Sequence, residues 1–278
     1  MPKILLTTLA YSNPDLLDKC LDSWYKHIPA EVDKGLLWQG YTNPEMEPII
    51  NKYLNKLNIY QRRVNNWAVS GGWNIMLREA FVKNNYNAIV IVGSDTAFLN
   101  NKFWDTIESN YHEAYDFVES SHQFNCFIIS NTCFEQVGLF DENFFNYVED
   151  DDYRIRVKKS GINYINNCGD RNLFYHYESA TVRRNSLLQL RSRKSFDLNR
   201  KYMHKKWGGV EHSNPKWNPI YNYPFDNKEW PLNKWVLDPE QRKKQLWHDI
   251  IDDDNDDRLM LLVNALNDPD KYQYTNES

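Results

Sequence analysis

Four consecutive carboxylates, residues 149–152, are the groups in this sequence that are best suited to chemistry. They follow an aromatic cluster made up of Phe140, Phe144, Phe145 and Tyr147, and they precede a segment with helical apolar spacing and cationic residues. Acidic runs are common on protein surfaces, but these acids adjoin side chains that should be buried. A carboxylate held in a cleft can have a pKa suited to removing a proton from a substrate. The run therefore predicts a catalytic base.

A single aspartate forms a second candidate site. The apolar run NAIVIVG (87–93) predicts a strand, which Ser94 and Asp95 end abruptly. In open α/β sheets, ligands bind beyond the carboxyl ends of the strands, so the Asp95 carboxylate would lie where a metal-bound diphosphate could reach it. A lone aspartate in this position is more often a turn former or a helix cap.

The acidic run lies in a longer motif. Residues 133–161, CFEQVGLFDENFFNYVEDDDYRIRVKKSG, resemble the FDExFFxYxEDxDxxxRxxxxG segment of family 2 glycosyltransferases, which are inverting enzymes with the GT-A fold. The resemblance implies that Asp150 removes a proton from an acceptor hydroxyl while that hydroxyl attacks the anomeric carbon of the donor sugar. Glu149 and Asp152 would position acceptor hydroxyls or anchor the entry of the helix, and Arg156 would pair with one of these acids.

The aspartate site resembles a second motif of the same family. The sequence VGSDTAF (92–98) is similar to the NxDT form of the family's DxD motif, with only the last carboxylate kept. In that family the aspartate, here Asp95, holds Mn²⁺ or Mg²⁺ against the diphosphate of a nucleotide-sugar, and the metal neutralises the departing group. His176 follows at about the place where the family has a histidine that completes this site. A lone histidine is more often a surface or core residue, but neutral imidazole is a suitable metal ligand.

A third segment, NNWAVSGGWN (65–74), resembles the family's NxGfxgGxN sequence before a helix, with Ala68 in place of the usual glycine. Glycines at a helix entry let the backbone approach a ligand, although a lone SGG is usually a plain turn. The donor-binding residues that the resemblance implies are Thr8, Ala10, Tyr11, Asn66, Gly71, Asn74, Ser94 and Asp95.

The donor nucleotide stays open. After its second strand the family commonly has an acidic motif that contacts the nucleoside, whereas this chain has Trp38, Gln39, Gly40 and Tyr41. UDP-, GDP- and dTDP-linked sugars are therefore all candidate donors, and the Asp95 motif is closest in form to rhamnosyl- and galactosyltransferases. The acceptor that the resemblance implies is a hydroxyl of a glycan or glycoconjugate.

Strand and helix patterns that alternate in the first half must position these groups. We expect Ser12 or Asn13 to cap the first helix, with Pro14 in its first turn. Repeated strand–helix units of this length indicate an α/β fold with a mostly parallel sheet and helices on both faces. Strands are expected at 3–10, 35–41, 58–64, 87–93 and, as two short strands, within 115–130; helices are expected at 14–27, 45–57, 70–84 and 101–110.

The pattern weakens beyond about residue 180. We expect a catalytic domain over 1–180 and an irregular C-terminal elaboration over 181–278, with helices near 184–205 and 239–266. Lysines and arginines crowd residues 183–206, which would form a solvated helix face, a cationic flap over the diphosphate, or a contact with an anionic acceptor or membrane surface. We expect most tryptophans of this tail to pack on the catalytic domain, with an acceptor platform as the alternative: Trp207, Trp217, Trp230, Trp235 and Trp247.

Composition excludes several classes of protein. The net charge of -5 does not provide the basic field that nucleic-acid binding usually needs. The four cysteines form no CxxC pair and no zinc spacing, which predicts reduced thiols in a cytoplasmic protein. The apolar run at the N-terminus is too short for a signal peptide, and no stretch approaches the ~20 apolar residues of a membrane span.

Three other functions fit parts of the sequence. A glycoside hydrolase also uses paired carboxylates, but it needs no diphosphate site at a strand end. A nucleotidyltransferase usually has a Gly-rich, cationic loop after the first strand, and LAYSNPD (9–15) has neither feature. A non-catalytic sugar-binding protein fits the aromatic content of 15%, but it would tolerate loss of the acids. The motifs together favour a metal-dependent, inverting glycosyltransferase.

Overall fold

The computed structural model of the chain describes most of its first 184 residues. The described residues are 2–40, 44–63, 68–112, 115–121, 123–141, 144, 147–169, 173–177, 180–184, 189, 196, 199, 200, 203, 204 and 207. Several of the expectations above lie outside them: Asn66, most of the helix near 184–205, the helix near 239–266 and the tryptophans after Trp207.

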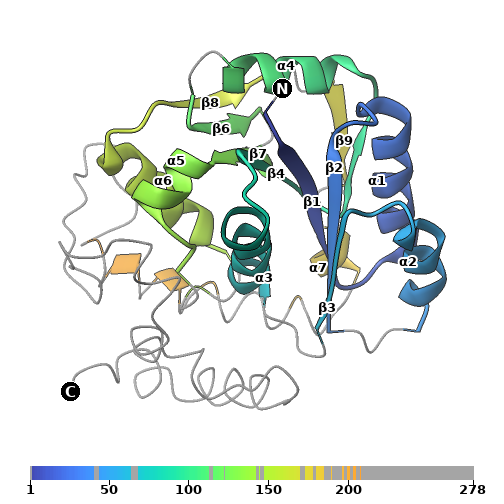
Figure 1. Cartoon of the computed structure of the whole chain (residues 1–278). Helices are drawn as coiled ribbons and strands as arrows, with labels where there is room; N and C mark the ends of the chain where they lie inside the picture. Colours follow the sequence, from blue (N-terminus) through green and yellow to red (C-terminus); the bar gives the residue numbers. More distant parts are fainter. Residues whose placement is uncertain are drawn as a thin grey trace.

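A seven-stranded sheet in the order β3-β2-β1-β4-β7-β6-β8 forms the centre of the fold. The first four strands in this order are parallel, β7 is antiparallel to both of its neighbours, and β8 is parallel to β6. This arrangement confirms the predicted α/β class with a mostly parallel sheet (Figure 1). The strands are β1 (Ile4–Ala10), β2 (Asp33–Gln39), β3 (Ile59–Arg63), β4 (Ala88–Val92), β6 (Phe117–Ser120), β7 (Gln123–Ser130) and β8 (Tyr164–Cys168).

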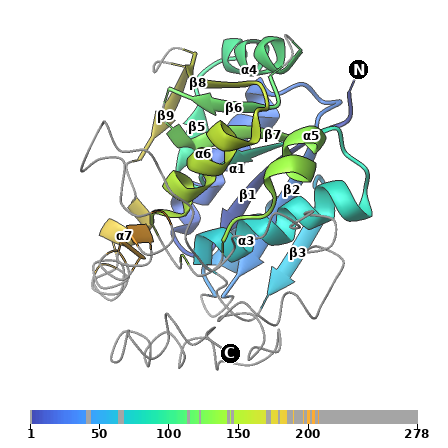
Figure 2. The ribbon, with the colours of Figure 1, turned by 90° about the vertical axis from the view of Figure 1, so that its left-hand side faces the viewer.

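Helices cover both faces of the sheet, so alternate residues of a strand enter different cores. Leu6 of β1 packs with α1 (Pro14–His27), α2 (Met46–Leu54) and α4 (Lys102–His112). Leu5 packs on the other face with α3 (Ala68–Leu77), α5 (Asn131–Val137) and α6 (Glu149–Ser160). Figure 2 views the molecule from the side of α3, α5 and α6. Because both faces are buried, the central strands are continuous apolar runs rather than alternating ones.

The helices differ from the expectations in their capping and in some of their boundaries. Helix α1 has the predicted bounds with Pro14 in its first turn, but Asn13 has φ 60° and its side chain makes no capping hydrogen bond. The amides of Leu16 and Leu17 donate to the Asn13 carbonyl instead. The helix expected over 70–84 is α3 followed by a π-helix, η1 (Arg78–Lys83). Ser130 caps α5, a helix that was not expected, by accepting a hydrogen bond from the Cys133 amide at 3.0 Å.

A second, two-stranded sheet brings distant parts of the chain together. Strand β5 (Thr96–Phe98) pairs antiparallel with β9 (Phe174–His176), and Thr96 lies opposite His176. The short helix α7 (Ala180–Arg183) follows. The cysteines, Cys20, Cys126, Cys133 and Cys168, are all buried and free. Among the residues that the structure describes, no helix is long and apolar enough to cross a membrane.

Candidate active site

Asp95 lies at the carboxyl end of β4 and is held there by the segment after β9. Its backbone carbonyl accepts a hydrogen bond from the Tyr177 amide at 2.9 Å, and its Oδ2 accepts one from the Ala180 amide at 3.2 Å. These contacts fix the carboxylate and leave Oδ1 directed at His176. The sequence placed both residues in one site, and the β5–β9 pairing brings them side by side.

The Asp95–His176 pair has the chemistry of a divalent-cation site. Asp95 Oδ1 lies 3.5 Å from His176 Nε2. On the far side of the ring, His176 Nδ1 lies 3.3 Å from the amide group of Asn125. The atom of Asn125 nearest Nδ1 is the amide nitrogen. With the amide turned so that its oxygen faces Nδ1, Asn125 would accept a hydrogen bond from Nδ1–H and hold the tautomer whose Nε2 can bind a metal.

Two protein ligands are sufficient for a cation whose remaining coordination positions are filled by the substrate and by water. Among the described residues there is no cluster of three or more His, Cys, Asp or Glu side chains. Mg²⁺ and similar cations keep several waters and take phosphate oxygens, so one or two protein ligands are sufficient. Asp95 and His176 therefore fit a metal–diphosphate complex better than a closed structural metal site.

A cavity of about 390 Å³ adjoins this pair. Its walls are Tyr175, His176, Tyr177, Ala180, Arg183 and Arg184. The two tyrosine rings meet edge to face with centroids 4.5 Å apart, and the Lys19 ammonium lies 5.1 Å from the centre of the Tyr177 ring. Arg183 donates to the Tyr177 carbonyl at 2.9 Å and Arg184 pairs with Asp15 at 3.0 Å, which holds both guanidinium groups in place. A cavity lined by cations and aromatic rings suits an anionic ligand with flat surfaces.

The four acids of the motif form the first turn of α6, and each has a different environment. Asp152 is fully buried, and its Oδ2 accepts a hydrogen bond from Arg156 Nε at 2.9 Å. Asp151 pairs with Arg154 at 2.8 Å. Asp150 has the most exposed side chain of the three aspartates, at 30%, and lies 3.5 Å from Arg154. The pairing expected for Arg156 is thus confirmed, with Asp152 as the partner.

Glu149 is the exception among these acids. Its side chain is only 6% exposed, and its Oε2 has no hydrogen-bond partner. Burial, followed by the charges of Asp150 and Asp151, raises the pKa of Glu149 well above its usual range. A desolvated carboxyl group that no cation contacts favours its neutral, protonated form.

Arg154 was not expected to belong to the site. Its guanidinium binds Glu119 of β6 through Nε at 3.1 Å and through Nη2 at 2.6 Å, while Nη1 reaches Asp151. Glu119 is itself buried, so the arginine joins the first turn of α6 to the sheet. Arg154 follows Asp151 by three residues and Asp150 by four, and this helical spacing was the sequence signal that could have identified its ion pairs with them.

The glycine-rich segment forms the start of α3 and packs on the sheet. Ala68, at the position where the family has glycine, has φ 56°, the left-handed conformation that glycine adopts most easily. A Cβ on Gly72 would lie 2.8 Å from Leu9 Cδ1 and 3.2 Å from Gln39 Oε1, so this glycine allows α3 to approach β1 and β2. The Asn74 side chain exchanges two hydrogen bonds of 2.8 Å with the Phe140 backbone.

The other implied donor-binding residues lie at or near one edge of the sheet. Ala10 ends β1, which is the neighbour of β4, and Tyr11 follows it. Ser94 follows β4, and both it and Tyr11 are half-buried. Thr8 is buried within β1, with an Oγ1 that has no partner, and Gly71 is buried within α3. The structure thus brings Ala10, Tyr11, Ser94 and Asp95 together at the carboxyl ends of the neighbouring strands β1 and β4. Their contacts with a donor stay predictions.

The chain is similar in fold to glycosyltransferases. No family model and no curated protein matches the sequence. A mannosyltransferase, PcManGT from Pyrobaculum calidifontis in complex with GDP-Man and Mn²⁺, matches with a TM-score of 0.52 and 12% identity over 99% of this chain and 84% of that chain. GalNAc-T7 with UDP, GalNAc and Mn²⁺ matches with 0.53 and 9% over 74% of this chain and 50% of that one.

TarS from S. aureus matches with a TM-score of 0.51 and 13% identity over 99% of this chain and 55% of that chain. The chain therefore spans about half of the length of TarS and of GalNAc-T7. At these identities the comparisons show the fold, and they confirm the GT-A architecture that the sequence predicted.

Proposed function

We propose that this protein is an inverting, metal-dependent glycosyltransferase of the family 2 type. It would move a sugar from a nucleotide-sugar to a hydroxyl of a glycan or glycoconjugate. The observation that carries the proposal is the juxtaposition of Asp95 and His176, 3.5 Å apart, where His176 also lines a cationic cavity. Two proteins of the same fold have a nucleotide or nucleotide-sugar and Mn²⁺ bound, namely GDP-Man in PcManGT and UDP in GalNAc-T7.

Asp95 and His176 would hold the cation through Oδ1 and Nε2. When bound, a divalent cation supplies charge that neutralises the diphosphate leaving group. Arg183 and Arg184 would contact the same phosphates, because they line the cavity beside His176. The tyrosines of this cavity would exclude water from the reacting bond.

Asp150 would act as the general base. It is the most exposed of the three aspartates in the acidic turn, so an acceptor hydroxyl can reach it. The hydroxyl oxygen forms a bond to the anomeric carbon, its proton passes to Asp150, and the bond to the diphosphate breaks with the electron pair leaving on the phosphate oxygen. One displacement of this kind inverts the anomeric centre. The other acids are engaged or buried, which supports a single base.

A binding experiment tests the diphosphate site. Thermal unfolding would be followed with UDP-, GDP- and dTDP-sugars, with and without Mn²⁺, because a ligand of the folded state raises the melting temperature. The cognate donor should stabilise the protein only when Mn²⁺ is present. Asp95→Asn should abolish this metal dependence and keep the melting temperature of the free protein. Metal-dependent stabilisation that survives in Asp95→Asn would remove Asp95 from the site.

A transfer experiment tests the base and separates catalysis from mere sugar binding. Asp150→Asn should keep donor affinity and lower the rate of transfer by the ~10²–10⁴-fold typical of a lost general base. Asp151→Asn is the matched control, because it removes a neighbouring carboxylate that pairs with the same arginine. Equal rates for wild type and Asp150→Asn would exclude the base assignment, and donor binding without any turnover would favour a non-catalytic sugar-binding protein.

The configuration of the first product tests the mechanism. An α-linked nucleotide-sugar should give a β-linked product, and a β-linked dTDP-L-rhamnose an α-linked one. Proton NMR of the anomeric signal distinguishes these outcomes within the first turnovers. A product that keeps the donor's configuration would contradict the single displacement.

A further inference from the structure

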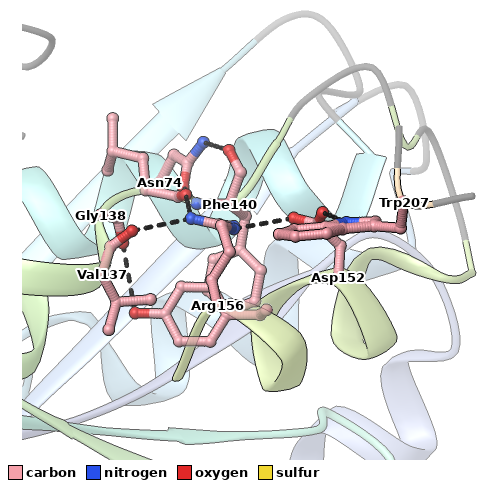
Figure 3. A network of polar contacts seen from close by, with 9 residues as sticks. Asn74, Val137, Gly138, Phe140, Asp152, Arg156 and Trp207 are labelled. Carbon is pink, nitrogen blue, oxygen red and sulfur yellow. Dashed lines mark hydrogen bonds and ion pairs between the residues drawn. The ribbon is translucent and has the colours of Figure 1, made fainter. Parts of the chain in front are cut away.

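Trp207 lies far along the chain from the acidic motif and yet contacts its centre. Its indole Nε1 donates a hydrogen bond to Asp152 Oδ1 at 2.7 Å, and the residue is 3% exposed. The other oxygen of Asp152 accepts from Arg156, whose Nη1 donates in turn to the carbonyls of Val137 and Leu139 at 2.9 and 2.8 Å. Figure 3 shows the indole and the guanidinium on opposite sides of the Asp152 carboxylate.

The same part of the chain packs against the entry of α6. Trp207 and Met203 form an apolar cluster with Phe144, Val148 and Ile155. Asn199, which is also buried, donates from its side chain to the Tyr147 carbonyl at 2.8 Å. Asn199, Met203 and Trp207 therefore contact the backbone and the side chains that lead into the acidic turn.

The entry that they contact is a strained piece of backbone. Tyr147 has φ 68° and Val148 has φ 72°, and the left-handed region is a true outlier for a β-branched residue. Such a conformation persists only where the surroundings hold it, and it occurs mainly at functional sites. Asp150 lies two residues after this turn, so its position depends on the same backbone.

We propose that Trp207 is a positioning residue for the acidic site. Its indole N–H holds Asp152 and its ring belongs to the apolar cluster that contains Val148, and together these contacts fix the first turn of α6 so that Asp150 faces an acceptor. Asn199, Met203 and Trp207 then serve the catalytic domain although they lie beyond residue 180. The consequence for sugar transfer rests on the proposed function, whereas the consequence for the structure of α6 does not.

Trp207→Phe is the test variant, since it removes the N–H donor and keeps a six-membered aromatic ring in the cluster. Trp104→Phe is the control, because Trp104 is an equally buried indole on α4, in the core on the other face of the sheet. Amide hydrogen exchange measures the first turn of α6 directly, through the Asp152 amide that donates to the Val148 carbonyl at 3.0 Å.

The expected result has a structural and a kinetic part. In Trp207→Phe, exchange of the 147–156 peptide should become at least ~10-fold faster, while that of β1 and β4 stays as in wild type. The kcat of transfer should fall by ~10²-fold, as for a catalytic group displaced by about 1 Å, with an unchanged nucleotide affinity. Trp104→Phe should show neither change in α6 nor a comparable loss of kcat.

Two results would overturn the proposal. One is unchanged exchange of the 147–156 peptide in Trp207→Phe, and the other is faster exchange with an unchanged kcat. If Trp207→Phe does not fold, Asn199→Ala removes the contact with Tyr147 and is judged by the same two readouts. A wild-type protein that transfers no sugar from any donor in the panel would refute the proposed function, and the exchange data would still decide whether Trp207 holds α6.

Discussion

Replacing Glu149 with glutamine should make the stability of the protein less dependent on pH. The glutamate is 6% exposed, its Oε2 has no partner, and burial followed by the charges of Asp150 and Asp151 raises its pKa. Glutamine has nearly the same shape as the protonated glutamate and cannot ionise. The variant thus keeps the neutral form in the acidic turn at every pH.

The size and sign of the effect follow from proton linkage. The pKa of an unfolded glutamate is about 4.3, and that of Glu149 in the folded protein is well above this value. Between the two pKa values the folded state holds a proton that the unfolded state has released, so stability falls as the pH rises. One proton changes the free energy of unfolding by up to about 1.4 kcal/mol per pH unit. Below the unfolded pKa this contribution to the slope disappears.

Urea unfolding of both proteins at a series of pH values from about 4.5 to about 8 measures the effect. The stability of Glu149→Gln relative to wild type should increase with pH across this window. Any constant difference, such as the cost of burying the amide, cancels because only the slope matters. Glu135→Gln, at an exposed position on α5, is the control for removal of one carboxyl group. Parallel curves for Glu149→Gln and wild type would refute the reasoning.

Three further predictions test other parts of the structure. Asp151→Asn should reduce the rate of transfer by less than ~10-fold, because Arg154 keeps its two-point contact with Glu119. An effect as large as that of Asp150→Asn would show that the base was assigned one residue too early in the sequence. Ala68→Gly should change the free energy of unfolding by less than about 1 kcal/mol in urea titrations, because relief of about 1–2 kcal/mol of left-handed strain is offset by lost methyl burial and greater unfolded-state entropy. The buried thiols should not react with a disulfide reagent at about pH 8 until urea is added. Burial raises the pKa of Cys20 and of Cys126, and it raises the pKa of Cys133 to about 12. Rapid labelling of the thiols without urea would contradict this prediction.

Much of the fold could be predicted because each central strand is a short apolar run that ends at a polar or glycine residue. Residues 3–10 and 87–93 were identified in this way, and the structure places β1 and β4 there as neighbours. The fold class followed from the alternation of these runs with helical segments. Strand β8, Tyr164–Cys168, was missed because its sequence, YINNC, contains two asparagines and is not continuously apolar.

The candidate site was less predictable, because its contacts join residues that are distant in the sequence. The sequence near Asp152 does not indicate that Trp207 will donate to it, and the expectations for this tryptophan were packing on the catalytic domain or an acceptor platform. The alanine at 68 indicated a departure from the family pattern, yet the structure keeps a left-handed turn there. Single-residue propensities cannot reveal such a case, because tertiary contacts hold a conformation that alanine disfavours.

The acidic turn shows how the fold can give four neighbouring acids different tasks. Successive residues of a helix point about 100° apart, so the first turn of α6 directs its carboxylates toward different surroundings. Arg156 neutralises Asp152 in the interior, and Arg154 pairs with Asp151. Burial favours the neutral form of Glu149. The most accessible of the three aspartates is Asp150, so the environments of its neighbours support the proposal that a single base acts within this run of four acids.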